Sequence, residues 1–347
     1  GVEQRVLGLG LASRKNLCIN EDVLRDGAAT GRSVDAQCHS RTASWVRQEA
    51  EEEGRQKKSQ LCEYFENLEA RRESAQSGTS LISPAIYTLD SLKELGRNLR
   101  LCPYFLARQC MLQAQVVIYS YYYLLDPKVA ELVSRELPRD AVVVFDEAHN
   151  IDNVCIESLS IELNRPALEA AGRSLSRLEE HVKRTGERDA ARLRDEYERL
   201  VAGLKAAGER RATDAVMANP VLPDDLLKEA VPGNIRRAEH YLAFMRRLLE
   251  FLKSRFRSTL HVVSETPTAF LAALRQATHI ERRPMRFCAE RLASLVRALQ
   301  LTGLDELAGL QRLAAFATLV STYLTGFTVL FEPVDDQAPD IPNPRLS

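Results

Sequence analysis

The sequence predicts a mixed fold that is mainly α-helical, with a small helical or irregular cysteine-bearing part and a partial α/β part. Three observations support this prediction. The first four of seven cysteines stand in polar sequence, a β-branched apolar run follows at residues 142–145, and residues 165–323 place apolar side chains at helical spacing. A continuous apolar run is typical of a strand buried on both faces of a parallel sheet, and helical spacing is typical of packed helices.

The size and charge of the chain limit its function classes. Its 347 residues are enough for two or three domains. Lys and Arg total 47 against 48 acidic residues, so any surface for nucleic acid must be local. No apolar run approaches the roughly 18 residues of a membrane span. We therefore expect a soluble, intracellular protein with no membrane partner.

Two adjacent acids follow the apolar run. Asp146 and Glu147 come directly after Phe145, at the carboxyl end of the expected strand, where α/β sheets bind ligands. One carboxylate there can hold a hydrated Mg²⁺ ion and the other can orient an attacking water. The alternative is that both acids begin a turn and cap a helix. The full Asp-Glu-Ala-His string, ending at His149, resembles the Walker B motif of superfamily 2 helicases and favours a nucleotide site.

A matching phosphate-binding loop is missing from this sequence. The nearest candidate to G-x-x-x-x-G-K-[ST] is Gly27–Ser33, which is one residue short and has Arg32 in place of lysine. We interpret it as a flexible polar loop. At the other end, the apolar run Phe327–Phe331 predicts a strand, which we expect to pair beside Ala141–Phe145. The start of the chain shows no initiator methionine, signal pattern or transit peptide, and a lone strand near the end needs a sheet to join, so both ends favour a piece of a longer protein.

The cysteines leave several interpretations open. Their odd number in a chain without a secretion signal argues against a disulfide framework. Between the first four there are 19, 23 and 39 residues, and no C-x-x-C pair occurs. The pair Cys102-Pro103 is found at many iron–sulfur ligands. Spacing alone fits a four-thiolate cluster, a zinc site or unrelated free thiols equally well.

Several strings resemble the iron–sulfur superfamily 2 helicases, most closely the XPD-type helicases, in the family's order along nearly the whole chain. They are Ser13–Asn20, Gln37–Val46, Leu101–Gln109, Val116–Ser134, Val142–Cys155, Thr213–Pro223 and Phe316–Pro333. The resemblance implies a RecA-like motor domain 1 that is interrupted by a cluster domain and by a helical Arch. It places the cluster domain at residues 1–105, part of motor domain 1 at 106–160, the Arch at 161–324 and a return to motor domain 1 at 325–347.

The resemblance also implies roles for single residues. The ligands of a 4Fe–4S cluster would be Cys18, Cys38, Cys62 and Cys102. In the nucleotide site of the intact enzyme, Asp146 would hold magnesium, Glu147 would activate water, and His149 would couple the nucleotide to movement.

A second implied set lines a path for single-stranded DNA. Its members are Arg14, Lys15, Tyr104 and Arg108. Cationic side chains hold phosphates, and a tyrosine face can stack a base without regard to sequence. Without the resemblance, a core aromatic residue and solvated cations would be the simpler interpretation.

The implied activity is that of an ATP-dependent 5′-to-3′ DNA helicase of the nuclear factor TFIIH, in nucleotide excision repair and transcription initiation. Without a phosphate loop or a second motor domain, we expect this chain alone to be inactive as an ATPase. An alternative is an interaction platform, in which the Arch docks the kinase-activating complex through MAT1 and DNA binding is incidental. A zinc-bound nucleic-acid module is a third possibility, disfavoured by the cysteine spacing.

The helical segment shows clear apolar stripes. One contains Tyr241, Leu242, Met245, Leu248, Leu249, Leu252 and Phe256, and similar stripes run through 287–299 and 310–323. Residues 189–204 predict a long charged helix, and residues 207–223 predict an irregular excursion. We interpret Cys110, Cys155 and Cys288 as small core-type residues. His39 is expected to be solvated or hydrogen-bonded.

Overall fold

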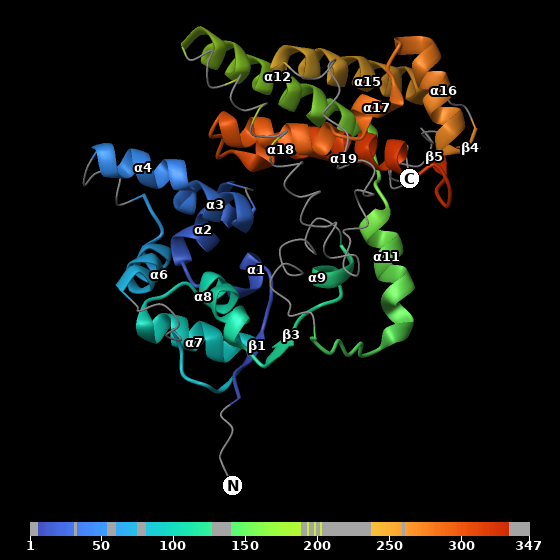
Figure 1. Ribbon diagram of the computed structural model, residues 1–347. Helices are drawn as coiled ribbons and strands as arrows, with labels where there is room; N and C mark the ends of the chain where they lie inside the picture. Colours follow the sequence, from blue (N-terminus) through green and yellow to red (C-terminus); the bar gives the residue numbers. More distant parts are fainter. Residues whose placement is uncertain are drawn as a thin grey trace. The chain divides into compact units, whose positions relative to one another are not determined.

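The computed structural model describes residues 6–30, 33–53, 60–74, 81–126, 140–188, 237–258 and 261–332, together with residues 193, 198 and 202 (Figure 1). The chain divides into two units, Gly1–Ser158 and Leu159–Ser347. Most described residues are helical and a small sheet is parallel, so the prediction of a mixed, mainly helical fold is confirmed. In these described ranges, no helix is long and apolar enough to cross a bilayer.

The first unit is built on a short parallel sheet. Strand β1 (Gly8–Gly10) lies between β2 (Ile86–Tyr87) and β3 (Val116–Ile118). Gly8 is paired with Ile86 on one side and Val116 on the other. Leu9 is buried at 2% exposure, whereas Ile86 is 78% exposed, so side chains of this sheet lie in very different surroundings.

Helices of the first unit begin where the sequence supplies a cap. The hydroxyl oxygens of Ser33 and Thr88 accept the backbone N–H of the third residue beyond them, and Pro103 lies in the first turn of α8. The helices are α1 (Arg14–Leu17), α2 (Glu21–Thr30), α3 (Val34–Thr42), α4 (Ser44–Glu53), α6 (Glu63–Ser74), α7 (Leu89–Leu99), α8 (Pro103–Cys110), α9 (Tyr122–Leu125) and α11 (Ile151–Leu159). Residues 27–30, which we interpreted as a loop, form the last turn of α2, so that interpretation was wrong for them.

One glycine allows α7 to approach the start of α8. A Cβ built on Gly96 would lie 2.5 Å from the Pro103 ring and 2.8 Å from the Leu101 carbonyl oxygen. Real Cβ atoms do not approach backbone so closely, and glycine avoids the collision because it has none. The absence of a side chain at Gly96 thus sets the position of Cys102, which lies between these two contacts in the chain.

The second unit is a helical layer structure with one continuous core. Its helices are α12 (Arg165–Arg188), α15 (Ala238–Ser258), α16 (Pro267–Thr278), α17 (Arg282–Met285), α18 (Cys288–Ala298) and α19 (Ala308–Thr322). The predicted stripe on α15 is confirmed, because Tyr241, Met245, Leu248 and Leu252 are completely buried. Helix α12 packs against α15 and α19.

A two-stranded ribbon closes this unit. Strand β5 (Val329–Phe331) pairs antiparallel with β4 (Val263–Glu265), so the expected pairing of residues 327–331 beside 141–145 was wrong. The reason lies in packing. Phe331 is 1% exposed, its ring is 6.0 Å from that of Phe256, and it stacks at 6.3 Å on Phe270. Burial of Phe331 in the aromatic core of the helical unit therefore places β5 beside β4.

The apolar run before the acids is not a strand in this structure. Residues 141–145 have no regular secondary structure, and Val142 and Val144 are 89% and 85% exposed. Our prediction of a buried strand here was therefore wrong. A strand needs hydrogen bonds from a neighbouring strand, and none of the described strands pairs with this run. The expected charged helix at 189–204, apart from residues 193, 198 and 202, and the expected excursion at 207–223 lie outside the described residues.

Candidate metal centre and cationic site

Four cysteines from separate segments are held in the first unit. Cys18 ends α1, Cys38 lies within α3, Cys62 precedes α6, and Cys102 precedes α8. Backbone hydrogen bonds join these segments: the Cys102 N–H donates to the Tyr64 carbonyl oxygen at 2.9 Å, and the Cys62 N–H donates to that of Arg41 at 3.2 Å. The fold therefore fixes the main chain at two of the four cysteines.

The thiols influence one another electrostatically. Burial raises the pKa of Cys38 to about 11, with further upward contributions from Cys62 and Cys18. Burial likewise raises the pKa of Cys102 to about 12, and Cys62 and Cys38 add to the shift. The pKa of Cys18 is raised, mainly by burial, with a contribution from Cys62. Burial is thus the main cause of the raised pKa of each of these three thiols, and other cysteines of the set contribute less.

The donor set suits a metal centre, because thiolates bind zinc as well as the irons of iron–sulfur clusters. Among the residues that the structure describes, no three His, Cys, Asp or Glu side chains converge tightly enough to hold one metal ion. Buried thiols with raised pKa values need a cationic partner before they ionise, and a bound metal would supply that charge.

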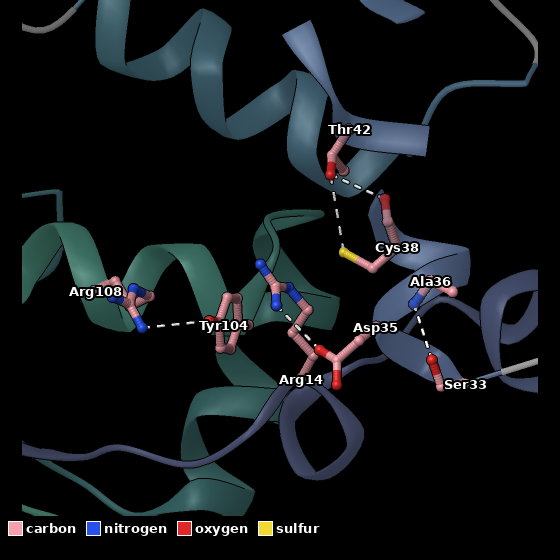
Figure 2. Close-up of polar contacts among 8 residues, drawn as sticks. All are labelled: Arg14, Ser33, Asp35, Ala36, Cys38, Thr42, Tyr104 and Arg108. Carbon is pink, nitrogen blue, oxygen red and sulfur yellow. Dashed lines mark hydrogen bonds and ion pairs between the residues drawn. The ribbon is translucent and has the colours of Figure 1, made fainter. Parts of the chain in front are cut away.

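A cationic stack lies beside Cys102. Figure 2 shows Tyr104, near the start of α8, between Arg14 and Arg108. The Arg14 guanidinium lies 4.7 Å from the centre of the Tyr104 ring, and that of Arg108 lies 5.6 Å from it. Arg108 also donates a hydrogen bond to the Tyr104 hydroxyl at 3.2 Å. Three of the four expected DNA-binding residues are therefore in contact, and the fourth, Lys15, is exposed next to Arg14.

Asp35 anchors this stack, and the sequence analysis missed it. Arg14 Nη1 donates to Asp35 Oδ1 at 3.0 Å, which ties α1 to α3 (Figure 2). Burial lowers the pKa of Arg14, but Tyr104, Asp35 and Cys38 together raise it above its ordinary value. Because Tyr104 is 9% exposed under these cations, its ring lacks the open face that we expected for stacking a base. No motif could have identified Asp35, since its partner is 21 residues away.

The expected nucleotide-site residues share one exposed turn. Asp146, Glu147 and His149 are all exposed, and Glu147 has a left-handed backbone with φ of 50°. His149 Nδ1 lies 3.3 Å from Glu147 Oε2. The acids therefore stand together, but without the buried strand that was expected to present them.

The remaining cysteines and His39 have structural surroundings. Cys110 and Cys288 are buried at 1% and 0% exposure, as expected for core residues, while Cys155 is half-buried. The His39 ring meets the Trp45 ring edge-on at 5.2 Å, and burial, with a smaller effect of Arg14, lowers its pKa. These contacts favour a packing role for His39.

Two family models match most of this chain. A family model described as DEAD_2 matches residues 2–168, and one described as "Helical and beta-bridge domain" matches residues 181–326. These matches place the chain in the class of proteins that combine a DEAD_2 domain with a helical and beta-bridge domain.

Three relatives refine this assignment. The "General transcription and DNA repair factor IIH helicase subunit XPD" of Schizosaccharomyces pombe is 50% identical over 346 residues, which is 100% of this chain and 43% of the relative. Its namesake in Arabidopsis thaliana is 49% identical over 100% of this chain and 44% of the relative. The XPD/RAD3 subunit of Saccharomyces cerevisiae is 44% identical over 100% and 43%. The chain belongs to the XPD family and spans less than half the length of these relatives.

Proposed function

We propose that this chain is the cluster-bearing and Arch portion of an ATP-dependent 5′-to-3′ DNA helicase subunit of TFIIH, which acts in the nucleus in nucleotide excision repair and transcription initiation. Similarity to relatives that carry this factor's name, along the whole chain, supports the proposal. We divide it into a cluster domain at 1–105, part of motor domain 1 at 106–160, the Arch at 161–324 and a return to motor domain 1 at 325–347.

The observation that carries the proposal is the set of hydrogen bonds that joins the segments of the four cysteines, beside the Arg14–Tyr104–Arg108 stack. Cys18, Cys38, Cys62 and Cys102 would hold a 4Fe–4S cluster. When bound, the cluster supplies cross-links between chain segments and a centre that can accept one electron.

Single-stranded DNA would bind at the cationic stack. Arg14, Lys15 and Arg108 would contact phosphates, since guanidinium and ammonium groups hold them irrespective of sequence. Tyr104 would act by orienting the two guanidinium groups, because both contact it and its ring is buried. Asp35 would fix Arg14 from the opposite side.

The intact subunit would bind Mg²⁺ and hydrolyse ATP. In that role Asp146 would hold Mg²⁺, Glu147 would orient the attacking water, and His149 would transmit the state of the nucleotide. This chain has no G-x-x-x-x-G-K-[ST] loop, and the side chains of Asp146 and Glu147 are exposed. We therefore expect it to be inactive alone as an ATPase.

The test is the iron and acid-labile sulfide content of anaerobically purified protein, with zinc measured in parallel. About four irons and four sulfides per chain would support the proposal. Stoichiometric zinc without sulfide would overturn the cluster. A fluorescence titration with an oligothymidylate then tests the DNA path.

A second candidate is a docking platform for MAT1 of the kinase-activating complex. The family resemblance implies this role, and the helical unit has its own continuous core and its own β-ribbon, as an independently folding module would. A 1:1 complex with MAT1 that survives Arg108→Ala and Tyr104→Ala would support the platform. Loss of single-strand binding in the same variants would support the DNA path, and both functions are compatible in the complete subunit.

A further inference from the structure

Asn20 is held against two of the four cysteines. Its side-chain nitrogen donates a hydrogen bond to Cys62 Sγ at 3.4 Å, and the Cys18 thiol approaches its backbone carbonyl oxygen at 4.0 Å. Asn20 is 9% exposed and Cys62 is 6% exposed, so the bond to Cys62 is shielded from water. A side chain two residues beyond Cys18 thus reaches a sulfur 42 residues further along the chain.

The orientation of the amide follows from its other contacts. Asn20 Oδ1 accepts the backbone N–H of Asp22 at 3.0 Å and that of Val23 at 3.3 Å, which makes Asn20 the N-cap of α2. Backbone N–H groups only donate, so the atom facing them must be the amide oxygen. The NH₂ group is therefore directed at Cys62, and the cap keeps it there.

We propose that Asn20 is a positioning residue of the metal centre, which donates a hydrogen bond to the Cys62 thiolate, favours the reduced cluster and slows the release of iron. This inference rests on the proposed 4Fe–4S cluster. A thiolate ligand shares the negative charge of its cluster, and one electron added by a reductant such as dithionite increases that charge without making or breaking a bond. A buried N–H donor therefore stabilises the reduced state more than the oxidised state.

Two substitutions separate this role from capping. Asn20→Asp keeps the shape and the cap acceptor but replaces the donor with a carboxylate oxygen. Asn20→Ser also keeps a good cap, carries no charge and is too short to reach Cys62 in the same way. Thr88→Ala is the matched control, because it removes the hydroxyl that caps α7 through the Ser91 N–H.

The experiment measures the midpoint potential by dithionite titration and the rate of iron loss to a chelator, on full chains that contain the cluster. For Asn20→Ser we expect iron loss to be about two- to tenfold faster, which matches the ordinary net contribution of one hydrogen bond. The potential should fall, and a tenfold change in the reduced-to-oxidised ratio would be about 59 mV for one electron. The midpoint potential of Asn20→Asp should fall further, because the carboxylate adds negative charge beside the cluster. Thr88→Ala should change neither quantity.

The outcomes keep the two proposals apart. Wild-type protein that contains no iron and sulfide would overturn the proposed function, whatever Asn20 does. Full cluster content in every variant, with an unchanged potential and an unchanged rate of iron loss in Asn20→Ser, would overturn the role of Asn20 alone. The melting temperature of each variant after iron removal identifies any loss of folding that is independent of the cluster.

Discussion

The two units of this protein differ in how completely they bury their apolar side chains. In the helical unit, one core runs from Leu163 to Phe331, and its aromatic rings contact one another across α15, α16, α19 and β5. In the first unit, a smaller core lies beside side chains that remain in solvent, such as Ile86 at 78% and Val142 at 89% exposure. Helices complete their backbone hydrogen bonds locally, whereas strands depend on neighbours.

The two units also differ in the interactions that stabilise them. The helical unit relies on apolar packing, while the first unit brings together cysteines, arginines and a buried asparagine that need polar partners or a metal. We therefore expect damage to one unit to leave the other largely intact, and the following experiments test that separation.

The largest effect should follow from loss of one cluster ligand. Cys102→Ser should reduce the iron content from about four per chain to near zero, because serine replaces a thiolate that binds iron. The helical unit should keep its melting temperature. Cys110→Ala is the matched control, since this buried thiol is in the helix that Cys102 precedes but outside the proposed ligand set. Retention of iron in Cys102→Ser would contradict the ligand assignment.

The next largest effect should come from the aromatic core. Phe270 is completely buried and meets Phe251 at 5.8 Å and Phe316 at 5.6 Å. Phe270→Ala should lower the free energy of unfolding of the helical unit by about 3–5 kcal/mol. Urea unfolding followed by circular dichroism measures this change. Ile86→Ala, at an exposed site of the first unit, should cost within about 0.5 kcal/mol. A loss of iron in Phe270→Ala would disprove the independence of the units.

A smaller effect is expected for DNA binding. Arg108→Ala should weaken the binding of an oligothymidylate and reduce the slope of log affinity against log salt by about 0.7, the value for one phosphate contact on a single strand. Arg297→Ala, an exposed arginine of the helical unit, is the control and should leave the slope unchanged. If Arg108→Ala shows the same affinity and the same salt slope as Arg297→Ala and the wild type, the cationic stack is not the DNA path.

The smallest effect should be a dependence of helical-unit stability on alkaline pH. Burial raises the pKa of Cys288 well above its ordinary value of 9.0, so the folded state keeps the thiol neutral while the unfolded chain ionises it. This stabilisation is complete below about pH 9 and is lost as the pH rises toward the folded pKa, with a slope of up to about 1.4 kcal/mol per pH unit. Thermal unfolding between pH 8 and 10.5 should show a shallower decline for Cys288→Ala. A decline equal to that of the wild type would contradict this account.

Local patterns predicted much of this molecule. The stripe on α15 became a buried face because its helix forms from contacts three and four residues apart, which the sequence displays directly. The four cysteines of the proposed cluster were recognised together from a family resemblance, which the strings around Cys18, Cys38 and Cys102 carry. Cys110 and Cys288 were expected in the core and are there.

Longer-range contacts were decided by the tertiary structure. The partner of β5 is β4, more than 60 residues earlier, and its choice depends on where Phe331 can be buried. Residues 141–145 have the composition of a strand, yet they remain exposed because no described strand pairs with them. Asn20 and Asp35 gained their roles from partners 42 and 21 residues away. The sequence by itself determined the apolar stripes of the helical unit and the residue types that could hold metal or phosphate, since these depend on near neighbours and side-chain chemistry. Only the tertiary structure decided strand pairing and the hydrogen bonds around the cysteines, because both require segments that are distant in sequence to meet.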